Sequence, residues 1–129
     1  METLGTTPEY LVPPSVVRAD GVGPVIELCG LEGKLLVLSL AINDVIEHEG
    51  LAISIYGSES GTEWEPLLTL PEKSYCGVYT TFLNLAKHAS VRYLRVEWKM
   101  RRWDQRHAGL LFGFQISVRP SRSQFHAAA

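Results

Sequence analysis

Residues Leu51–Leu70, LAISIYGSESGTEWEPLLTL, carry the clearest fold signal in the sequence. Its first apolar residues recur at every second position, as in a strand that buries one face. The run Gly57–Thr62 then stops the strand, because glycine and serine favour turns. A second extended segment begins at Trp64, and Pro66 places that segment at a sheet edge or a bulge. The stretch therefore predicts a β-hairpin.

Further segments of the chain share this extended pattern. They are Ser15–Arg18, Val25–Cys29, Leu35–Asn43, Val78–Leu85, Arg92–Met100 and Leu111–Val118. Turn-forming residues separate them, and Ala86–Ser90 is long enough only for a helical turn. Many short strands, each with one strongly apolar face, predict an all-β fold, an antiparallel β-sandwich or jelly roll. We expect its core to include Leu38, Ile55, Val96 and Phe114.

The chain length fits a single domain, since 129 residues can bury a core without cross-links. We predict an irregular N-terminal lead-in over residues 1–14, which hold three prolines. One β-sandwich domain over residues 15–119 and a flexible tail over residues 120–129 follow. Trp64 and Trp98 occupy strand positions and are expected to pack within the domain.

Composition limits the classes of function. Hydrophobic residues make up 46% and charged residues 20%, as in ordinary globular proteins, and the formal net charge is −2. This acidic balance argues against nucleic-acid binding. No apolar run approaches the roughly 20 residues that cross a bilayer, and the N-terminus lacks the pattern of a signal peptide. We therefore expect a cytoplasmic protein with no membrane partner, in which Cys29 and Cys76 stay unpaired.

Two motifs resemble those of a known family. Ser58–Trp64, SESGTEW, resembles the Ser-x-Asp-Gly-x-x-Trp signature of discoidin-like domains, the coagulation-factor 5/8 type C or galactose-binding-like jelly roll. The family's later Arg-Tyr-Ile/Leu-Arg-Val/Ile strand has a counterpart in Arg92–Val96, RYLRV. The resemblance spans Leu35–Arg119. It implies a jelly-roll sandwich whose ligand residues lie on variable loops.

The chain also departs from that family. Ser60 stands where the signature has Asp. Neither Cys29 nor Cys76 is placed for the disulfide that often ties together the two ends of the family's extracellular members. The resemblance therefore implies an intracellular or bacterial member, and no ligand residue carries over by motif.

Sheet topology predicts that three loops share one end of the sandwich. If consecutive strands alternate in direction, the loops 44–50, 71–77 and 101–109 emerge together, and an acidic loop meets a basic one. Loops carry most binding sites, which favours this end as a functional one. The candidate ligand- or partner-binding residues there are Asp44, Glu47, His48, Glu49, Tyr75, Arg101, Arg102, Trp103, Asp104, Arg106 and His107.

Different roles fit these residues. An aromatic ring among arginines and carboxylates suits carbohydrate recognition, in which the ring stacks and the charged groups bind hydroxyls. The run Lys99–His107, with Trp103 available for stacking, also resembles a nucleic-acid patch, but Glu97, Asp104 and the net charge oppose that reading. The structural alternative is that the opposite charges simply neutralise each other.

The sequence offers no pattern typical of catalysis or metal binding. Glu47, His48 and Glu49 are adjacent, so their side chains point apart on an extended loop, and no zinc- or calcium-type spacing is present. Cys76 and a histidine could form a nucleophile pair, yet no third orienting residue is evident. Nucleotide-binding and hydrolase motifs are missing. We predict no enzyme activity, no metal site and no cofactor.

The sequence favours a non-catalytic binding or interaction module. Its first version is protein–protein assembly or self-association through loops or an outer sheet face. Apolar residues expected outside the core are candidates for such a patch: Leu35, Val37, Tyr56 and Tyr93. Trp103, in a loop among arginines, is the residue we expect to anchor a partner. The second version is a carbohydrate-binding module that uses the loop end, and an enzyme of unknown chemistry comes third.

Overall fold

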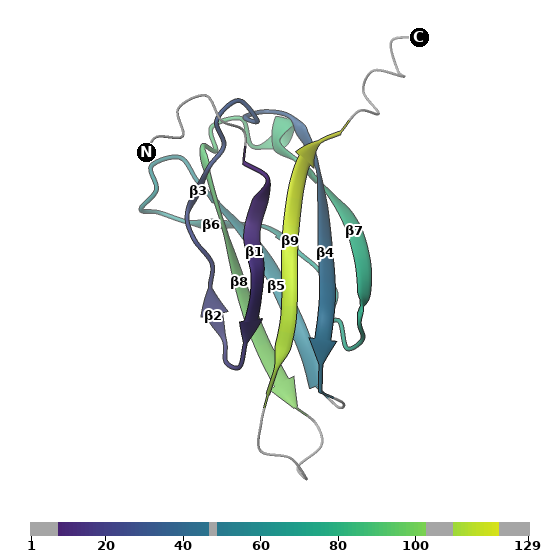
Figure 1. Cartoon of the computed structure of the whole chain (residues 1–129). Coiled ribbons are helices and arrows are strands. Elements are labelled where there is room, and N and C mark those ends of the chain that lie inside the picture. Colours follow the sequence, from purple (N-terminus) through teal and green to yellow (C-terminus); the bar gives the residue numbers. More distant parts are fainter. Residues whose placement is uncertain (1–7, 47–48, 103–109, 122–129) are drawn as a thin grey trace.

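A computed structural model describes residues 8–46, 49–102 and 110–121 of the chain (Figure 1). Most of these residues lie in strands, and one short 3₁₀ helix, η1, spans Leu85–Lys87. The all-β fold predicted from the sequence is confirmed. The strands in chain order are β1 (Tyr10–Val17), β2 (Gly21–Val22), β3 (Ile26–Glu27), β4 (Leu35–Val45), β5 (Glu49–Ser58), β6 (Glu65–Thr69), β7 (Gly77–Asn84), β8 (Tyr93–Arg102) and β9 (Phe112–Pro120).

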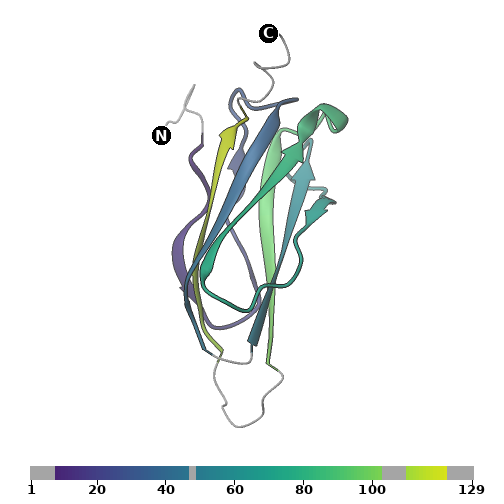
Figure 2. The ribbon, with the colours of Figure 1, turned by 90° about the vertical axis from the view of Figure 1, so that its right-hand side faces the viewer.

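Within the described residues, the strands form two antiparallel sheets that pack face to face. The four-stranded sheet has the order β1-β9-β4-β7. The five-stranded sheet has the order β2-β8-β5-β6, and β3 also pairs with β8. Figure 2 shows the two layers side by side, with the connection from β6 to β7 crossing between them. The predicted β-sandwich is therefore confirmed.

The core lies between the sheets and consists of the alternating apolar residues of each strand. Trp98 of β8 meets Phe114 of β9 edge to face, with ring centroids 5.5 Å apart, and its Nε1–H donates to the carbonyl of Ala19 at 3.0 Å. Trp98 thus packs within the domain as predicted. The four residues expected in the core, Leu38, Ile55, Val96 and Phe114, are all buried.

The decisive hairpin forms as predicted, from β5 and β6. Gly61 has a φ of +90°, a conformation that glycine adopts without strain, and its N–H donates to Ser58 Oγ at 2.7 Å. Pro66 lies in the edge strand β6, next to a break in the β5–β6 register. An edge or a bulge is where a proline does not interrupt a ladder.

The first strand begins inside the range that the sequence predicts to be irregular. β1 starts at Tyr10 rather than at Ser15, and Leu11 and Val12 are buried in the core. Pro13 and Pro14 fit because β1 is an edge strand, and its pairing with β9 shifts register across them.

Other strand boundaries also differ from the predictions. β4 continues to Val45 and β5 begins at Glu49, so the predicted loop 44–50 is largely strand. Gly50 pairs with Arg101 and Glu49 with Arg102, so cross-strand pairing overrides the polar composition at these ends. Near the N-terminus, the two-residue β2 lies between the predicted strands 15–18 and 25–29, and the second of these shortens to β3.

Cys29 and Cys76 are both free thiols and form no disulfide, as the sequence predicts. Among the residues that the structure describes, no helix has the length and apolar character needed to span a membrane.

Candidate functional site

The loops predicted to share one end of the sandwich do so where the structure describes them. The ends of β4 and β8 and the beginnings of β5, β7 and β9 meet there, at the bottom of Figure 1. Of the predicted site residues, five are described: Asp44, Glu49, Tyr75, Arg101 and Arg102. The other six lie outside the described residues: Glu47, His48, Trp103, Asp104, Arg106 and His107.

Glu49 is a buried structural residue and not an exposed ligand-binding one. Its carboxylate accepts hydrogen bonds from the backbone N–H of Ile46 at 2.7 Å and of Leu111 at 3.0 Å. The guanidinium of Arg102, itself only 9% exposed, lies 3.9 Å from the carboxylate. Glu49 thus links the ends of β4, β5, β8 and β9. Burial corrects the prediction that a ligand could reach this side chain.

A second ion pair crosses the same end nearer the surface. Arg101 donates from Nε and Nη2 to the two carboxylate oxygens of Glu72, at 2.8 and 2.9 Å. These hydrogen bonds, and then the charge of Glu72, raise the pKa of Arg101. Gly50 makes room for the pair, because a Cβ at this position would overlap the Glu72 side chain.

Asp44 and Tyr75 remain on the surface. Asp44 pairs with Gly113 across a register shift, and it lines a hollow of about 240 Å³ together with Pro14, Ser15 and Asn43. The Tyr75 side chain is 77% exposed, and the Tyr75 carbonyl accepts from the hydroxyl of Tyr79 at 2.9 Å.

The described charges at this end therefore serve mainly to hold strands together. Glu49 with Arg102 and Glu72 with Arg101 join segments that are distant in sequence. Within the described ranges, no group of three or more histidines, cysteines or acidic residues is placed to hold a metal ion. The neutralising role that the sequence analysis left open describes these residues best.

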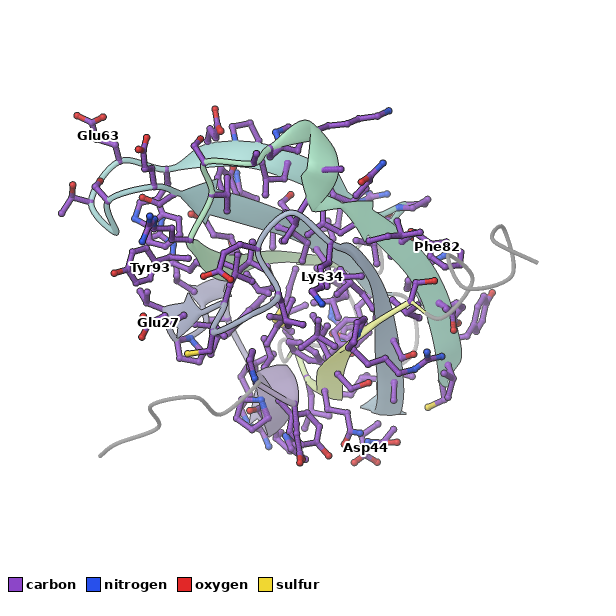
Figure 3. All side chains as sticks on the ribbon, turned by 90° about the horizontal axis from the view of Figure 1, so that it is seen from above. Glu27, Lys34, Asp44, Glu63, Phe82 and Tyr93 are labelled. Atoms are coloured by element: carbon purple, nitrogen blue, oxygen red, sulfur yellow. The ribbon has the colours of Figure 1, made fainter. Side chains whose placement is uncertain are left out.

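The opposite end holds a hollow that the sequence analysis did not predict. Its volume is about 370 Å³, and its lining includes Trp64 and Ser90. Three glutamates, Glu59, Glu63 and Glu65, complete its polar wall, and Figure 3 shows Glu63 projecting from the β5–β6 turn. The hollow joins an aromatic ring to carboxylates, which accept hydrogen bonds from hydroxyl or amine groups.

Trp64 packs across strands as expected, but outside the core. The guanidinium of Arg95 lies 4.4 Å from the centroid of the Trp64 ring, and Arg95 also donates to Glu97 at 3.1 Å. The two motifs that resemble discoidin-like domains therefore touch each other on the outer face of the five-stranded sheet. This contact explains why Trp64 lines the hollow while remaining half-buried.

Three of the four sheet edges carry features that discourage pairing with another chain. β1 contains Pro13 and Pro14 and two register shifts. β6 has only five residues and begins with Glu65 and Pro66. On the third of these edges, β2 and β3 have two residues each, and Pro24 lies between them. Prolines, bulges, charges and short strands are the usual protection of an edge.

The fourth edge, β7, has none of these features. It runs for eight residues, GVYTTFLN, without a proline or a charged side chain. β4 pairs with it on one side, and no other described strand pairs with its free side (Figure 1). Its backbone N–H and C=O groups on the free side are therefore open to a further strand.

Apolar side chains lie on the outer face beside this edge. Val78 is 70% exposed and Phe82 is 56% exposed, and Figure 3 shows Phe82 on the outer side of β7. Their partners on β4 are Ala41, which is half-buried, and Val37, which is buried. We call these four residues and Leu35 the β7 patch. The sequence signal for it is the charge-free run 77–84, most of which falls within the predicted strand Val78–Leu85.

Comparisons with known proteins leave the family open. No protein-family model matches the chain, and no curated protein matches it. Among solved structures, the chain is similar to one described as the structure of infectious bursal disease virus, Gx strain, with 10% identity and a TM-score of 0.41. The similarity covers 85% of this chain and 28% of that chain. This chain thus spans less than a third of that chain's length, and a likeness this weak carries no argument.

Proposed function

We propose that this protein is a non-catalytic interaction module that binds an extended segment of a protein along the free edge of β7. The contrast among the four edges carries the proposal. Three edges are protected, whereas β7 offers eight uncharged residues, of which the five from Val78 to Phe82 have high β-propensity. Strand addition to an open edge is a common mode of protein recognition, in which backbone hydrogen bonds give affinity and side chains give specificity.

The β7 patch supplies the side-chain part of such an interface. Val78 and Phe82 are the exposed large apolar residues within β7, and cross-strand neighbours on one face contribute to sheet stability. Of the apolar candidates named from sequence, Leu35 lies half-buried on β4 beside this edge, whereas Val37 is buried and is not an exposed contact. Tyr56 and Tyr93 belong to the five-stranded sheet and do not contribute.

Site-specific photo-crosslinking in the cells that naturally produce the protein tests the proposal. A benzophenone side chain at position 80, in the middle of β7, should give a covalent adduct with a protein, which mass spectrometry identifies. The matched control is position 16, since Val16 is 61% exposed on the proline-protected edge β1. An adduct at position 80 without one at position 16 supports the proposal. No adduct at position 80, or equal adducts at both positions, contradicts it.

A carbohydrate-binding function is the second candidate, and the hollow beside Trp64 favours it. An aromatic ring among carboxylates fits a hydroxyl-rich ligand. This places the alternative at the end opposite the loops named from sequence. A thermal-shift screen against sugars tests it, because a ligand of the native state raises the apparent Tm. The shift should vanish in Trp64→Ala, and the absence of any shift would remove this candidate.

A further inference from the structure

We infer that the strand that adds to β7 is the β7 strand of a second copy of this chain, related by a two-fold axis through Thr80. This inference rests on the proposed function and names its partner. Two-fold dimers are the commonest oligomers of soluble proteins, and their interfaces must be complementary to themselves. The β7 strand must therefore be able to pair with a copy of itself.

Charge is the first requirement of self-pairing. Like charges placed directly opposite each other destabilise a pair of strands. The range Gly77–Asn84 contains no charged residue, so two copies can align antiparallel without repulsion along the ladder. A partner of strongly charged sequence would find no complementary charge within this strand.

The pleat then restricts the register. Directly opposite residues in an antiparallel pair lie on the same face of the sheet. Val78, Thr80 and Phe82 are exposed, whereas the intervening Tyr79 and Thr81 are half-buried. Exposed residues of one copy must therefore face exposed residues of the other. Since these residues are two apart in sequence, an even-numbered residue faces an even-numbered one.

The register centred on Thr80 uses this strand best. The registers centred on Thr80 and on Thr81 each pair seven of the eight residues, but only the first sets the two exposed apolar residues against each other. It places Thr80 opposite its own copy. Val78 of each copy then faces Phe82 of the other on the exposed face. Aromatic and β-branched residues are among the favourable cross-strand pairs. The two four-stranded sheets become one continuous sheet, and the two most exposed apolar side chains of β7 cover each other.

Cysteine cross-linking tests this register directly. In a Cys29→Ser, Cys76→Ser background, Thr80→Cys should form a disulfide-linked dimer under mild oxidation. Directly opposite Cα atoms lie about 4.5–5.5 Å apart, within the range of a disulfide. Val78→Cys alone should not link, since its two copies would lie about 13 Å apart along the strand. A mixture of Val78→Cys with Phe82→Cys should link only between the two variants.

The outcomes separate this inference from the proposed function. A linked dimer of Thr80→Cys, together with linking of the mixture, supports the two-fold pairing. Linking at Thr81→Cys in place of Thr80→Cys overturns the register. If neither Thr80→Cys nor Thr81→Cys links, and position 80 gives a photo-adduct with a different protein, the partner is not a second copy of this chain. The proposed function then still stands. No linking and no adduct removes both. Each variant's circular dichroism spectrum checks that it folds.

Discussion

Glu49 shows how one buried residue can be easily mistaken for part of a binding site. In sequence it belongs to an acidic loop, yet its carboxylate is enclosed and accepts two backbone hydrogen bonds beside Arg102. A buried carboxylate persists only where such partners compensate for lost solvation. Its function is therefore to hold four strand ends together. The more exposed ion pair of Glu72 with Arg101 lies at the same end of the sandwich and is expected to contribute less.

We predict that Glu49→Gln destabilises the protein by about 1–3 kcal/mol, because the amide nitrogen cannot accept from a backbone N–H and one buried donor loses its partner. Glu72→Gln is the matched control. It alters an ion pair with an exposed arginine, for which about 0–1 kcal/mol is usual. Urea unfolding of both variants measures the difference. Equal losses for the two would contradict the structural role given to Glu49.

Cys29 is a second residue whose surroundings predict its chemistry. Desolvation raises the pKa of its thiol, and the carboxylates of Glu27 and Glu32 raise it further. A higher pKa leaves less thiolate at a given pH, and thiolate is the reactive form. In a Cys76→Ser variant, alkylation of Cys29 near pH 8 should be slower in the native protein than in urea. Glu27→Gln should raise the native rate, and a native rate equal to the unfolded one would contradict this prediction.

At the scale of elements, the β5–β6 hairpin depends on the conformation of its turn. Gly61 has a positive φ, and an added Cβ would approach only the Tyr93 ring, at 3.7 Å. The cost of a side chain there is therefore backbone strain rather than collision.

We predict that Gly61→Ala lowers stability by about 1–3 kcal/mol, the usual cost of a strained backbone position. D-alanine at position 61, introduced by chemical synthesis, favours positive φ and should restore most of the loss. Glu59→Ala, an exposed change in the same turn, should have little effect. Thermal unfolding compares the three variants, and an unchanged Tm for Gly61→Ala would show that the turn tolerates a side chain.

The strands that could be predicted from sequence are those in which large apolar residues recur at every second position. Leu36 to Ile42 in β4 and Leu94 to Met100 in β8 place every second side chain in the core, and a period of two fixes the face. Strand ends were less predictable, since pairing carries charged residues such as Arg101 into a ladder. Prolines concealed β1, because an edge strand accepts them and a central strand does not.

The candidate site was less predictable than the fold, for a physical reason. Alternation shows which side chains face inward, but it does not show which strand lies at the edge of a sheet. That property follows from the order β1-β9-β4-β7, which joins segments far apart in the chain. The run 77–84 therefore looks like any other strand until its single neighbour, β4, is known. The discoidin-like subtype stays a prediction.

At the scale of the whole molecule, the sandwich is asymmetric in what it offers to other molecules. One end is held together by paired charges, the opposite end carries a polar hollow around Trp64, and one of its four edges is open. Joining two open edges would cover the unpaired backbone groups of β7 and keep each core unchanged. We therefore predict a dimer whose subunits fold independently.

Sedimentation equilibrium over a wide concentration range measures this dimerisation, with wild type, Thr80→Lys and Val16→Lys compared. The wild type and Val16→Lys should pass from monomer to dimer as concentration rises. Thr80→Lys should stay monomeric, because its two lysines would face each other across the axis. Circular dichroism and thermal unfolding should show that all three monomers fold alike. A wild type that stays monomeric throughout, or a Thr80→Lys variant that dimerises as wild type does, would contradict the account.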